Sequence, residues 1–239
     1  MTELAPGPIR VLIAEDQALL RASFAALMNA ETDLHVVGRA ADGAQAVALA
    51  SRLRPDVVVM DIQMPGLSGI EATRRICADS ALAGTRVLVL TMFEVEDYML
   101  GALRAGASGF LLKDASPQAV VDAVRTVHAG QSLLSPQVVT TLAARGAGSA
   151  CVAGAAGAGP GAVGSAPALG RLTPRQRDVL VLIARGLSNA EIEAELGIRR
   201  ATCRSHITAL LARLGARDRA QLVIAAYEAG LVRPGNSGN

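Results

Sequence analysis

The first half of the chain alternates short apolar runs with longer segments in which apolar residues recur every three or four positions. The short runs are largely apolar and rich in Val, Leu and Ile, which is typical of strands buried on both faces of a sheet. The longer segments have the spacing of amphipathic helices. The predicted strands are residues 9–14, 34–38, 56–60, 86–90 and 109–113, and the predicted helices are residues 17–29, 43–53, 69–78, 94–106 and 117–130. Five strand–helix units predict an α/β domain with a doubly wound five-stranded parallel sheet.

Local signals mark where two of these helices begin. Ser68 and Glu71 have the spacing of a capping box, in which the serine caps the helix and the glutamate side chain returns to the serine backbone. Ser116 precedes Pro117, which places a capping hydroxyl before a proline in the first turn. Helices are therefore expected to begin directly after Ser68 and Ser116.

The pattern of the last third is helical only. Thr173 and Gln176 form one capping-box pair, Ser188 and Glu191 form another, and Gly197 is placed to end a short helix. The predicted helices here are residues 175–186, 189–196, 201–215 and 217–230. Short helices separated by a glycine turn predict a small all-α domain of the helix-turn-helix type.

Composition and charge indicate where the two parts divide. Residues 145–170 are almost entirely Gly, Ala, Ser and Pro and have no periodic apolar face, which predicts a flexible linker. Residues 1–140 carry 11 basic and 15 acidic side chains, whereas residues 171–239 carry 11 basic and 6 acidic ones. The change in the sign of the net charge between these segments indicates two domains with different partners. The predicted division is a domain at 1–130, a linker at 131–170 that is partly helical and then flexible, and a second domain at 171–239.

Bulk composition argues against membrane insertion and a disulfide framework. Apolar residues make up 51% of the chain, yet no uninterrupted apolar run reaches the roughly 18 residues of a membrane span. The first residues lack a basic start followed by an apolar stretch, so no secretory signal is expected. The three cysteines lie far apart and have no paired spacing. We therefore expect a cytoplasmic protein with reduced thiols.

Polar side chains stand at the ends of four predicted strands. Glu15 and Asp16 follow the first strand, Asp61 the third and Thr91 the fourth, and Lys113 closes the fifth. Ligands of open parallel sheets bind beyond the carboxyl ends of the strands, so these side chains are expected to converge. Clustered carboxylates are hard oxygen ligands that suit Mg²⁺, which could orient a phosphoryl group toward a carboxylate nucleophile.

Lys113 is the only lysine, since the other 22 of the 23 basic residues are arginine. An ammonium on a flexible stem can approach both a carboxylate and a phosphoryl oxygen, whereas the planar guanidinium needs more room. Taken singly, these residues have simpler interpretations: Asp16 as a helix cap, Thr91 as an ordinary strand end, and Lys113 as a solvated strand end. The set of five in chain order favours a site.

At these residues the chain resembles a known family. The segments LIAEDQALLR, VVVMDIQMPGLSGIEA, VLVLTMF and GASGFLLKD resemble the receiver domain of bacterial two-component response regulators. The segments LTPRQRDVLVLIARGLSNAEIEAELGI and ATCRSHITALLARLGARDRAQLV resemble the LuxR-type DNA-binding domain. Together they resemble a response regulator of the NarL/FixJ type, over nearly all of the chain except the linker and the termini. The resemblance implies a flavodoxin-like receiver followed by a helix-turn-helix domain.

The resemblance implies a role for each residue at the strand ends. Asp61 would accept the phosphoryl group. Asp16, Asp61 and the backbone carbonyl of Gln63 would ligate Mg²⁺, and Glu15 would act largely through a bound water.

Three further residues would sense the phosphoryl group. Thr91 would move its hydroxyl onto the aspartyl phosphate, and Lys113 would pair with the phosphate. Phe110 would occupy the aromatic position that turns inward on activation. This role for Phe110 rests on the resemblance alone, because a phenylalanine on an apolar strand is usually a core residue.

The helix predicted at 201–215 has two different faces. Small and hydroxyl side chains on one face suit close approach to a major groove, and the other face is apolar. The apolar face comprises Cys203, Ile207, Leu210, Leu211 and Leu214, so Cys203 is expected to be a buried core residue.

The same helix begins with two arginines, where the helix dipole disfavours positive charge. The family commonly has Ser-Glu at this point, so Arg199 and Arg200 depart from its pattern. We expect both to contact DNA phosphates. Arg204, Ser205 and Thr208 match the base-reading positions of the family.

The predicted function is a transcription factor controlled by phosphorylation. A sensor histidine kinase would phosphorylate Asp61, and the protein, as a homodimer when phosphorylated, would bind double-stranded promoter DNA. The chain would not be an enzyme beyond slow self-dephosphorylation. The last predicted helix could serve either the core or a dimer contact.

Alternatives from other classes remain at this stage. The first domain could be a flavodoxin-like domain that binds a nucleotide or flavin, although no Gly-rich turn follows its first strand. It could also be a phosphatase that uses Asp61 as its nucleophile, or a receiver that never takes phosphate.

Overall fold

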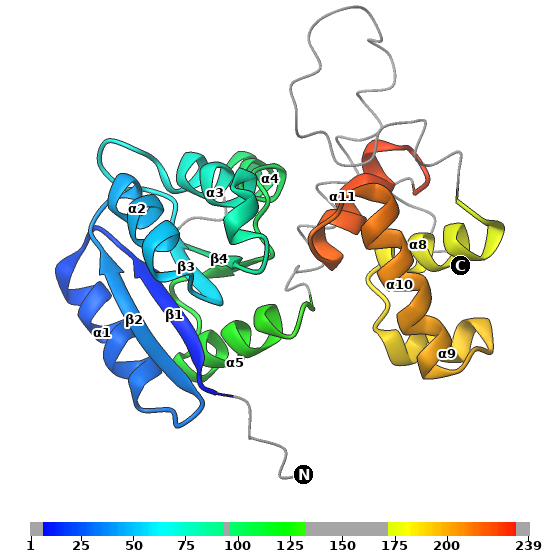
Figure 1. Cartoon of the computed structure of the whole chain (residues 1–239), viewed down its shortest axis with the longest axis horizontal. Coiled ribbons are helices and arrows are strands. Elements are labelled where there is room, and N and C mark those ends of the chain that lie inside the picture. Colours follow the sequence, from blue (N-terminus) through cyan, green and yellow to red (C-terminus); the bar gives the residue numbers. More distant parts are fainter. Residues whose placement is uncertain (1–6, 93–95, 132–171, 233–239) are drawn as a thin grey trace, which may run out of the picture. The chain divides into compact units, whose positions relative to one another are not determined.

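The structure of the protein is a computed structural model that describes residues 7–92, 96–131 and 172–232 (Figure 1). The chain divides into two compact units, Met1–Leu133 and Leu134–Asn239. Apart from Gln131, the predicted linker lies outside the described residues.

The first unit contains the predicted five-stranded parallel sheet. The strands are β1 (Ile9–Ala14), β2 (Leu34–Ala40), β3 (Val57–Asp61), β4 (Arg86–Thr91) and β5 (Gly109–Leu112). Their order in the sheet is β2-β1-β3-β4-β5, and every neighbouring pair is parallel. Asp61 and Thr91 are the last residues of their strands, and Lys113 comes directly after β5, each one residue from its predicted place.

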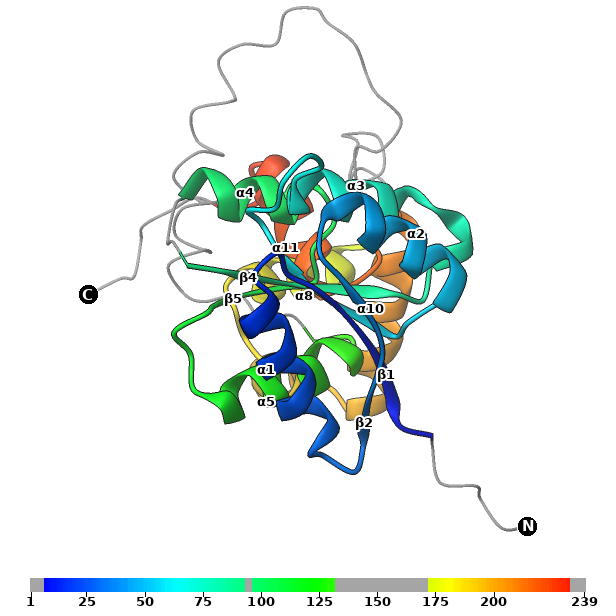
Figure 2. The same ribbon diagram turned by 90° about the vertical axis from the view of Figure 1, so that its left-hand side faces the viewer.

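Helices cover both faces of this sheet, which confirms the doubly wound prediction. The helices are α1 (Ala18–Asn29), α2 (Gly43–Leu53), α3 (Gly69–Ala78), α4 (Glu96–Arg104) and α5 (Pro117–His128). Figure 2 shows α1 and α5 on one face and α2, α3 and α4 on the other. A short 3₁₀ helix, η1 (Ser80–Leu82), was not expected from the apolar pattern, and the Asp79 side chain caps it.

The alternation of side chains along the strands divides the core between these faces. On one side, alternate residues such as Val11 and Ile13 of β1 pack in a cluster with α1 and α5 residues including Met28 and Val124. The residue between them, Leu12, is also fully buried. Burial on both faces explains why the central strands are apolar at consecutive positions, as at residues 11–14 and 57–60.

Side-chain caps begin three helices of this unit. Asp42 accepts from the Gln45 N–H at the start of α2, and Ser116 caps α5 with Pro117 in its first turn, as predicted. Ser68 accepts from the Glu71 N–H at 3.3 Å, which confirms half of the predicted capping box.

The other half of that capping box is wrong. The Glu71 carboxylate pairs with Arg74 and Arg75 on the next turn of α3. A salt bridge one turn along the helix therefore replaces the bond back to the Ser68 backbone.

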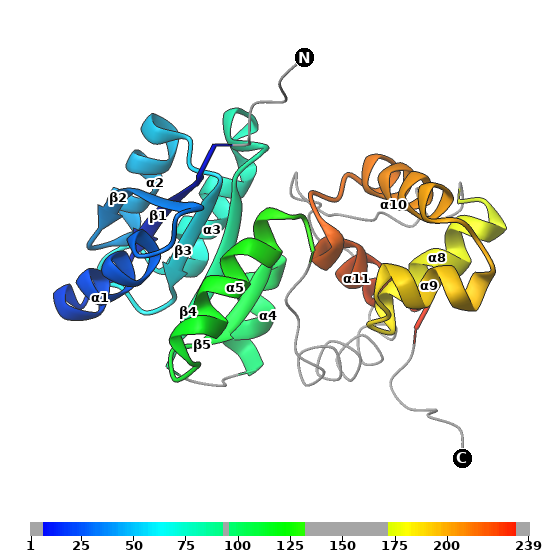
Figure 3. The same ribbon diagram turned by 90° about the horizontal axis from the view of Figure 1, so that it is seen from below.

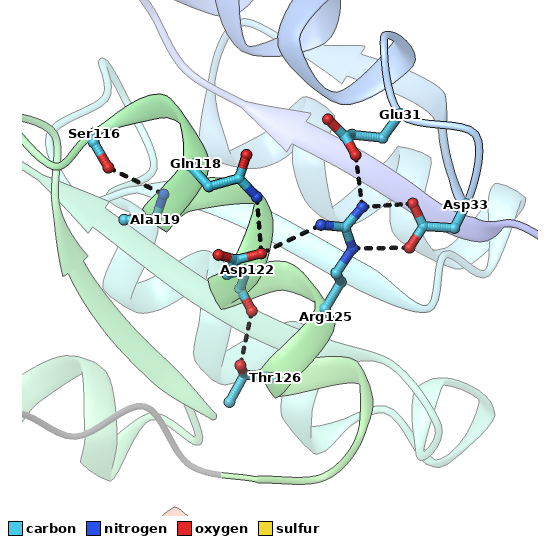
Figure 4. A network of polar contacts seen from close by, with 8 residues as sticks. All are labelled: Glu31, Asp33, Ser116, Gln118, Ala119, Asp122, Arg125 and Thr126. Carbon is cyan, nitrogen blue, oxygen red and sulfur yellow. Dashed lines mark hydrogen bonds and ion pairs between the residues drawn. The ribbon is translucent and has the colours of Figure 1, made fainter.

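Arg125 joins α5 to the turn between α1 and β2 (Figure 4). Its guanidinium donates to both carboxylate oxygens of Asp33, at 2.7 and 2.8 Å, and to Glu31 at 2.7 Å. The guanidinium lowers the pKa of Asp33. Asp122, one turn back on α5, accepts from the same guanidinium at 3.2 Å. This bidentate contact fixes α5 against the α1 side of the sheet.

The second unit is the predicted all-helical domain (Figure 3). Its helices are α8 (Pro174–Ala184), α9 (Asn189–Leu196), α10 (Arg200–Leu214) and α11 (Arg219–Glu228). Both predicted capping boxes, at the starts of α8 and α9, form completely. Gly197 ends α9 in the left-handed conformation at φ 61°, which a residue with a Cβ adopts only at a cost.

The last helix contributes to the core of this unit. α11 packs against α8 and α10, and all of its residues from Ala220 to Tyr227 are buried. The Tyr227 hydroxyl donates to the Ala184 carbonyl of α8 at 3.2 Å. In the part of the chain that the structure describes, no helix is both long and apolar enough to span a bilayer.

Candidate functional site

The carboxyl edge of the sheet brings the five predicted residues together. β1 and β3 are neighbours, and β4 and β5 follow in order, so Glu15, Asp61, Thr91 and Lys113 lie along one rim. Glu15 is 2% exposed, Asp61 4% and Thr91 1%, whereas Asp16 is exposed. A buried pair of carboxylates is costly unless a cation or hydrogen-bond donors balance its charge.

Lys113 provides that balance. Its ammonium lies 2.6 Å from Oε2 of Glu15 and 3.0 Å from Oδ2 of Asp61, and its side chain is only 3% exposed. The lysine is therefore not a solvated strand end. Its backbone N–H donates to the Thr91 carbonyl at 2.8 Å, which fixes the start of the side chain beside β4.

The three carboxylates form a group that suits a divalent cation. One oxygen from each of Glu15, Asp16 and Asp61 lies within 4.8 Å of the others. All are hard oxygen ligands of the kind that Mg²⁺ takes one or two at a time. A small pocket opens at this group, and its lining residues are Asp16, Gln17, Asp61, Gln63, Thr91, Met92 and Lys113.

Burial raises the pKa of the Glu15 carboxyl above its ordinary value. Removal from water is the largest cause, and the negative charge of Asp61 adds to it. The hydrogen bond and positive charge of Lys113 act in the opposite direction. The net result of these opposing causes is that the Glu15 carboxyl holds its proton more tightly than a free glutamate does.

Asp16 does not cap the first helix. The residue at the cap position of α1 is Gln17, and no side chain accepts a capping hydrogen bond there. Arg21, in the second turn of α1, donates through Nη1 to the backbone carbonyls of Glu15 at 2.6 Å and of Asp16 at 3.1 Å. The turn that presents Asp16 is therefore held by a guanidinium.

The loop after Asp61 approaches α3 closely. The Gly69 N–H donates to the Ile62 carbonyl at 2.9 Å. A Cβ added at Gly69 would lie 1.8 Å from the backbone oxygen of Asp61. Only glycine fits there, because the helix begins directly against the backbone of Asp61. Gln63 lies on this loop and lines the pocket.

Phe110 lies on β5, opposite Val89 of β4, and is 7% exposed. This burial is what a core residue would show. The structure therefore places Phe110 in the core beside β4.

The predicted DNA-contacting residues lie on α10 or, for Arg199, directly before it. Arg199, Arg200, Arg204, Ser205 and Thr208 are all exposed. The apolar face points inward as predicted, with Cys203, Leu210 and Leu214 buried and Ile207 and Leu211 half-buried. Burial raises the pKa of the Cys203 thiol, which favours the unreactive protonated form.

Arg199 occupies the cap position of α10 and makes no side-chain capping bond. The first N–H groups of α10 therefore lack the side-chain oxygen that caps α8 and α9. Two exposed arginines therefore lie at the positive end of the helix dipole.

Three arginines of this unit are structural, which sequence reasoning did not find. Arg175 donates to the Leu196 carbonyl, Arg213 to Oε1 of Gln176 at 2.9 Å, and Arg219 to Oδ1 of Asn189 at 2.8 Å. These bonds tie the ends of α8 and α9 to other helices. Part of the basic charge therefore holds the helix-turn-helix together.

Sequence reasoning also missed Gln17 and Met92, which line the pocket, and Arg21, which bonds to the backbone of the adjoining turn. Gln17 and Met92 line the pocket because they directly follow Asp16 and Thr91, so adjacency to a predicted residue was the available signal. For Arg21 the only signal was its position in a helix that starts at the site.

Two family models match the chain. The response regulator receiver domain matches residues 11–125, and bacterial regulatory proteins of the luxR family match residues 170–226. The transcriptional regulatory protein YxjL of Bacillus subtilis is 36% identical over 225 residues, which cover 94% of this chain and 98% of that protein. The transcriptional regulatory protein LiaR of the same organism is 36% identical over 94% of this chain and 99% of its own length.

Solved structures agree with these matches. A two-component response regulator of the LuxR family from Aurantimonas sp. SI85-9A1 is 33% identical, with a TM-score of 0.53 over 58% of this chain and 98% of that one. A structure of two RcsB dimers bound to two parallel DNAs has a TM-score of 0.51 at 20% identity, over 93% of this chain and 99% of that one, which shows a shared fold.

Proposed function

Because the chain belongs to the LuxR-type family of two-component response regulators, we propose that phosphorylation of Asp61 by a sensor histidine kinase controls its binding to promoter DNA. One observation carries the proposal. The buried Asp61 carboxylate lies at a pocket where two further carboxylates and a buried ammonium surround it.

Asp61 is the proposed nucleophile. Its carboxylate oxygen forms a new bond to phosphorus, and the bond between phosphorus and the imidazole nitrogen of the kinase's phosphohistidine breaks. Lys113, at 3.0 Å from the Asp61 carboxylate, keeps its positive charge beside the group as phosphate charge arrives. The Thr91 hydroxyl then donates to a phosphate oxygen, and Phe110 repacks as the rim rearranges.

The residues present fit a divalent cation. Glu15, Asp16, Asp61 and the backbone carbonyl of Gln63 would hold Mg²⁺. A bound ion would supply charge neutralisation and orientation for the transferring phosphoryl group. The protein acts as a phosphoacceptor, so one phosphoryl group per chain is expected, and rapid turnover of a phosphorylated substrate would instead favour a phosphatase.

The basic unit is the proposed output. Arg199 and Arg200 contact phosphates, while Arg204, Ser205 and Thr208 read base edges in the major groove. The phosphorylated protein binds as a homodimer, because helix-turn-helix proteins read two half-sites about one helical turn apart.

We assign residues 1–130 to the receiver, 131–170 to the linker and 171–239 to DNA binding. Because promoter DNA is its proposed partner, we expect the protein to act in the cytoplasm.

The test compares wild-type protein with Asp61→Asn. Both are incubated with Mg²⁺, with and without a small phosphodonor, and their affinity is measured for a promoter fragment that the wild-type protein selects in vitro. We expect the phosphodonor to strengthen binding by the wild type only. Equal responses of the two proteins would refute control through Asp61, and failure of the wild-type protein to select any DNA fragment would refute DNA binding as the output.

A further inference from the structure

Arg21 contacts the main chain of the site and not its carboxylates. Its Nη1 donates to the carbonyls of Glu15 and Asp16, at 2.6 and 3.1 Å. These two carbonyls belong to the peptide groups on either side of the Asp16 Cα. Holding both peptide groups fixes the φ and ψ of Asp16, and hence the direction of its Cβ.

Nothing else in this turn replaces that contact. Side chains cap α2, α3 and α5, whereas α1 begins at Gln17 without one. The Glu15 N–H donates to the Ala40 carbonyl at 3.1 Å, which secures the turn only on its β1 side. The Gln17 N–H contacts the Glu15 carboxylate at 3.3 Å, a long bond to a group that also pairs with Lys113.

We propose that Arg21 is a positioning residue, which holds the exposed Asp16 carboxylate in place at the cation site through the backbone. This inference rests on the proposed function, because it concerns the same Mg²⁺ site. The two hydrogen bonds are strong because their donor is charged, and hydrogen bonds from ionised donors are stronger than those between neutral groups. Asp16 is thereby left uncommitted to capping, and its oxygen stays within 4.8 Å of those of Glu15 and Asp61.

Arg21 could affect metal affinity through its positioning of Asp16 or through its charge, and the two predict opposite effects when Arg21 is removed. A guanidinium beside the site repels a cation, so loss of its charge alone would strengthen metal binding. Loss of the Asp16 geometry would weaken metal binding. Partners outside the ligand set commonly change metal affinity about 10- to 100-fold when they are removed. A weaker site in an Arg21 variant therefore identifies positioning.

The experiment measures Mn²⁺ affinity of the full chain from the electron paramagnetic resonance signal of free Mn²⁺. We expect Arg21→Gln to bind about 10- to 100-fold more weakly than wild type. The loss should persist at about 1 M salt, where the screening length falls to about 3 Å. Arg21→Lys keeps the charge and some donors, so it should recover part of the affinity. Thermal unfolding checks that each variant is folded. If Arg21→Gln is not folded, Arg21→Lys is compared with wild type instead.

Two controls make the outcome decisive. Arg52→Gln removes an exposed arginine in the last turn of α2, at the opposite edge of the sheet, and should leave the affinity unchanged. Asp16→Ala combined with Arg21→Gln should bind no more weakly than Asp16→Ala alone, because Arg21 acts through Asp16. Unchanged or tighter binding by Arg21→Gln, or fully additive losses, would overturn the inference. Failure of wild type to bind Mn²⁺ would instead overturn the proposed Mg²⁺ site.

Discussion

At the scale of single residues, the one lysine of the chain has a physical reason to be a lysine. Lys113 lies between two buried carboxylates, at 2.6 and 3.0 Å, in a space that leaves its side chain 3% exposed. An ammonium can approach two oxygens from different residues at once. A guanidinium is wider and pairs best with both oxygens of one carboxylate.

Lys113→Arg should fold, accept a phosphoryl group on Asp61 and fail to convert it into tighter DNA binding. The wider side chain overpacks the site, at a cost of about 1–3 kcal/mol in the free energy of unfolding. Phosphorylation is measured by mass spectrometry and DNA affinity by titration, with Asp61→Asn as the unphosphorylated reference. Normal phosphate-dependent DNA binding by Lys113→Arg would contradict the role of the ammonium.

Stability without metal should fall as the pH rises above the ordinary pKa of a glutamate. The folded protein raises the pKa of Glu15 by burial, so the folded state holds this proton more tightly than the unfolded state does. The stabilisation is complete below the unfolded value, 4.5, and is lost as the pH rises through the folded value. Denaturant unfolding across this range measures the slope, and Glu15→Gln should flatten it. An equal slope in both proteins would assign the effect to other groups.

At the scale of elements, close contacts between backbone segments shape the site. The start of α3 lies against the backbone of Asp61, where an added Cβ at Gly69 would be 1.8 Å from the carbonyl oxygen. Ser68 caps the same helix, so the loop that joins β3 to α3 is fixed at its α3 end.

Gly69→Ala should move the Asp61 loop and lower the free energy of unfolding by about 1–3 kcal/mol, as overpacking does. Because the clash involves backbone atoms, relaxation must displace Asp61 or α3. We expect slower phosphorylation by a small phosphodonor. Gly84→Ala is the matched control, since a Cβ there meets no neighbour within 4 Å. If both variants behave as wild type, the close approach does not shape the site.

The start of α10 is the element that we expect to meet the DNA backbone. Replacing Arg199 and Arg200 with Ser and Glu should weaken binding to every sequence. Each lost phosphate contact should reduce the slope of log affinity against log salt by about 0.9. The Gln-Gln variant removes the same charge without adding a negative one, so it separates lost contacts from repulsion. A salt slope equal to that of wild type would mean that neither arginine touches a phosphate.

At the scale of the whole molecule, two units of opposite charge each have their own core. The chain contains no tryptophan and two tyrosines, Tyr98 in the receiver and Tyr227 in the helical unit. Each unit therefore has a single phenol that reports on its own unfolding. This distribution permits a test of how independently the units respond to metal.

Mg²⁺ should raise the midpoint of thermal unfolding of the receiver and leave that of the helical unit unchanged. A ligand that binds only the folded receiver stabilises it by about 2.7 kcal/mol at a hundred times its dissociation constant. Tyrosine fluorescence of Tyr227→Phe follows the receiver, and that of Tyr98→Phe follows the helical unit. A shift of equal size in both variants would show that the two units unfold as one.

The sequence by itself determined the elements of this protein and the edge of the sheet where its chemistry lies. Apolar periodicity and capping residues act over a few positions, so the strands, most helix starts and the αL glycine Gly197 followed from local patterns. The rim residues Asp61 and Lys113 were predictable because parallel strands all end at the same edge.

Only the tertiary structure decided which groups meet. No spacing in the sequence predicts that Lys113 pairs with Glu15 or that Arg21 bonds to the turn at Asp16. The same holds for the hydrogen bonds that three arginines make to other helices of the second unit, namely Arg175, Arg213 and Arg219. A long side chain can reach several acceptors, and its partner depends on distance and burial. Both are set only when the helices have packed. The same competition occurs within α3, where the Glu71 carboxylate pairs with Arg74 and Arg75 and not with the Ser68 backbone.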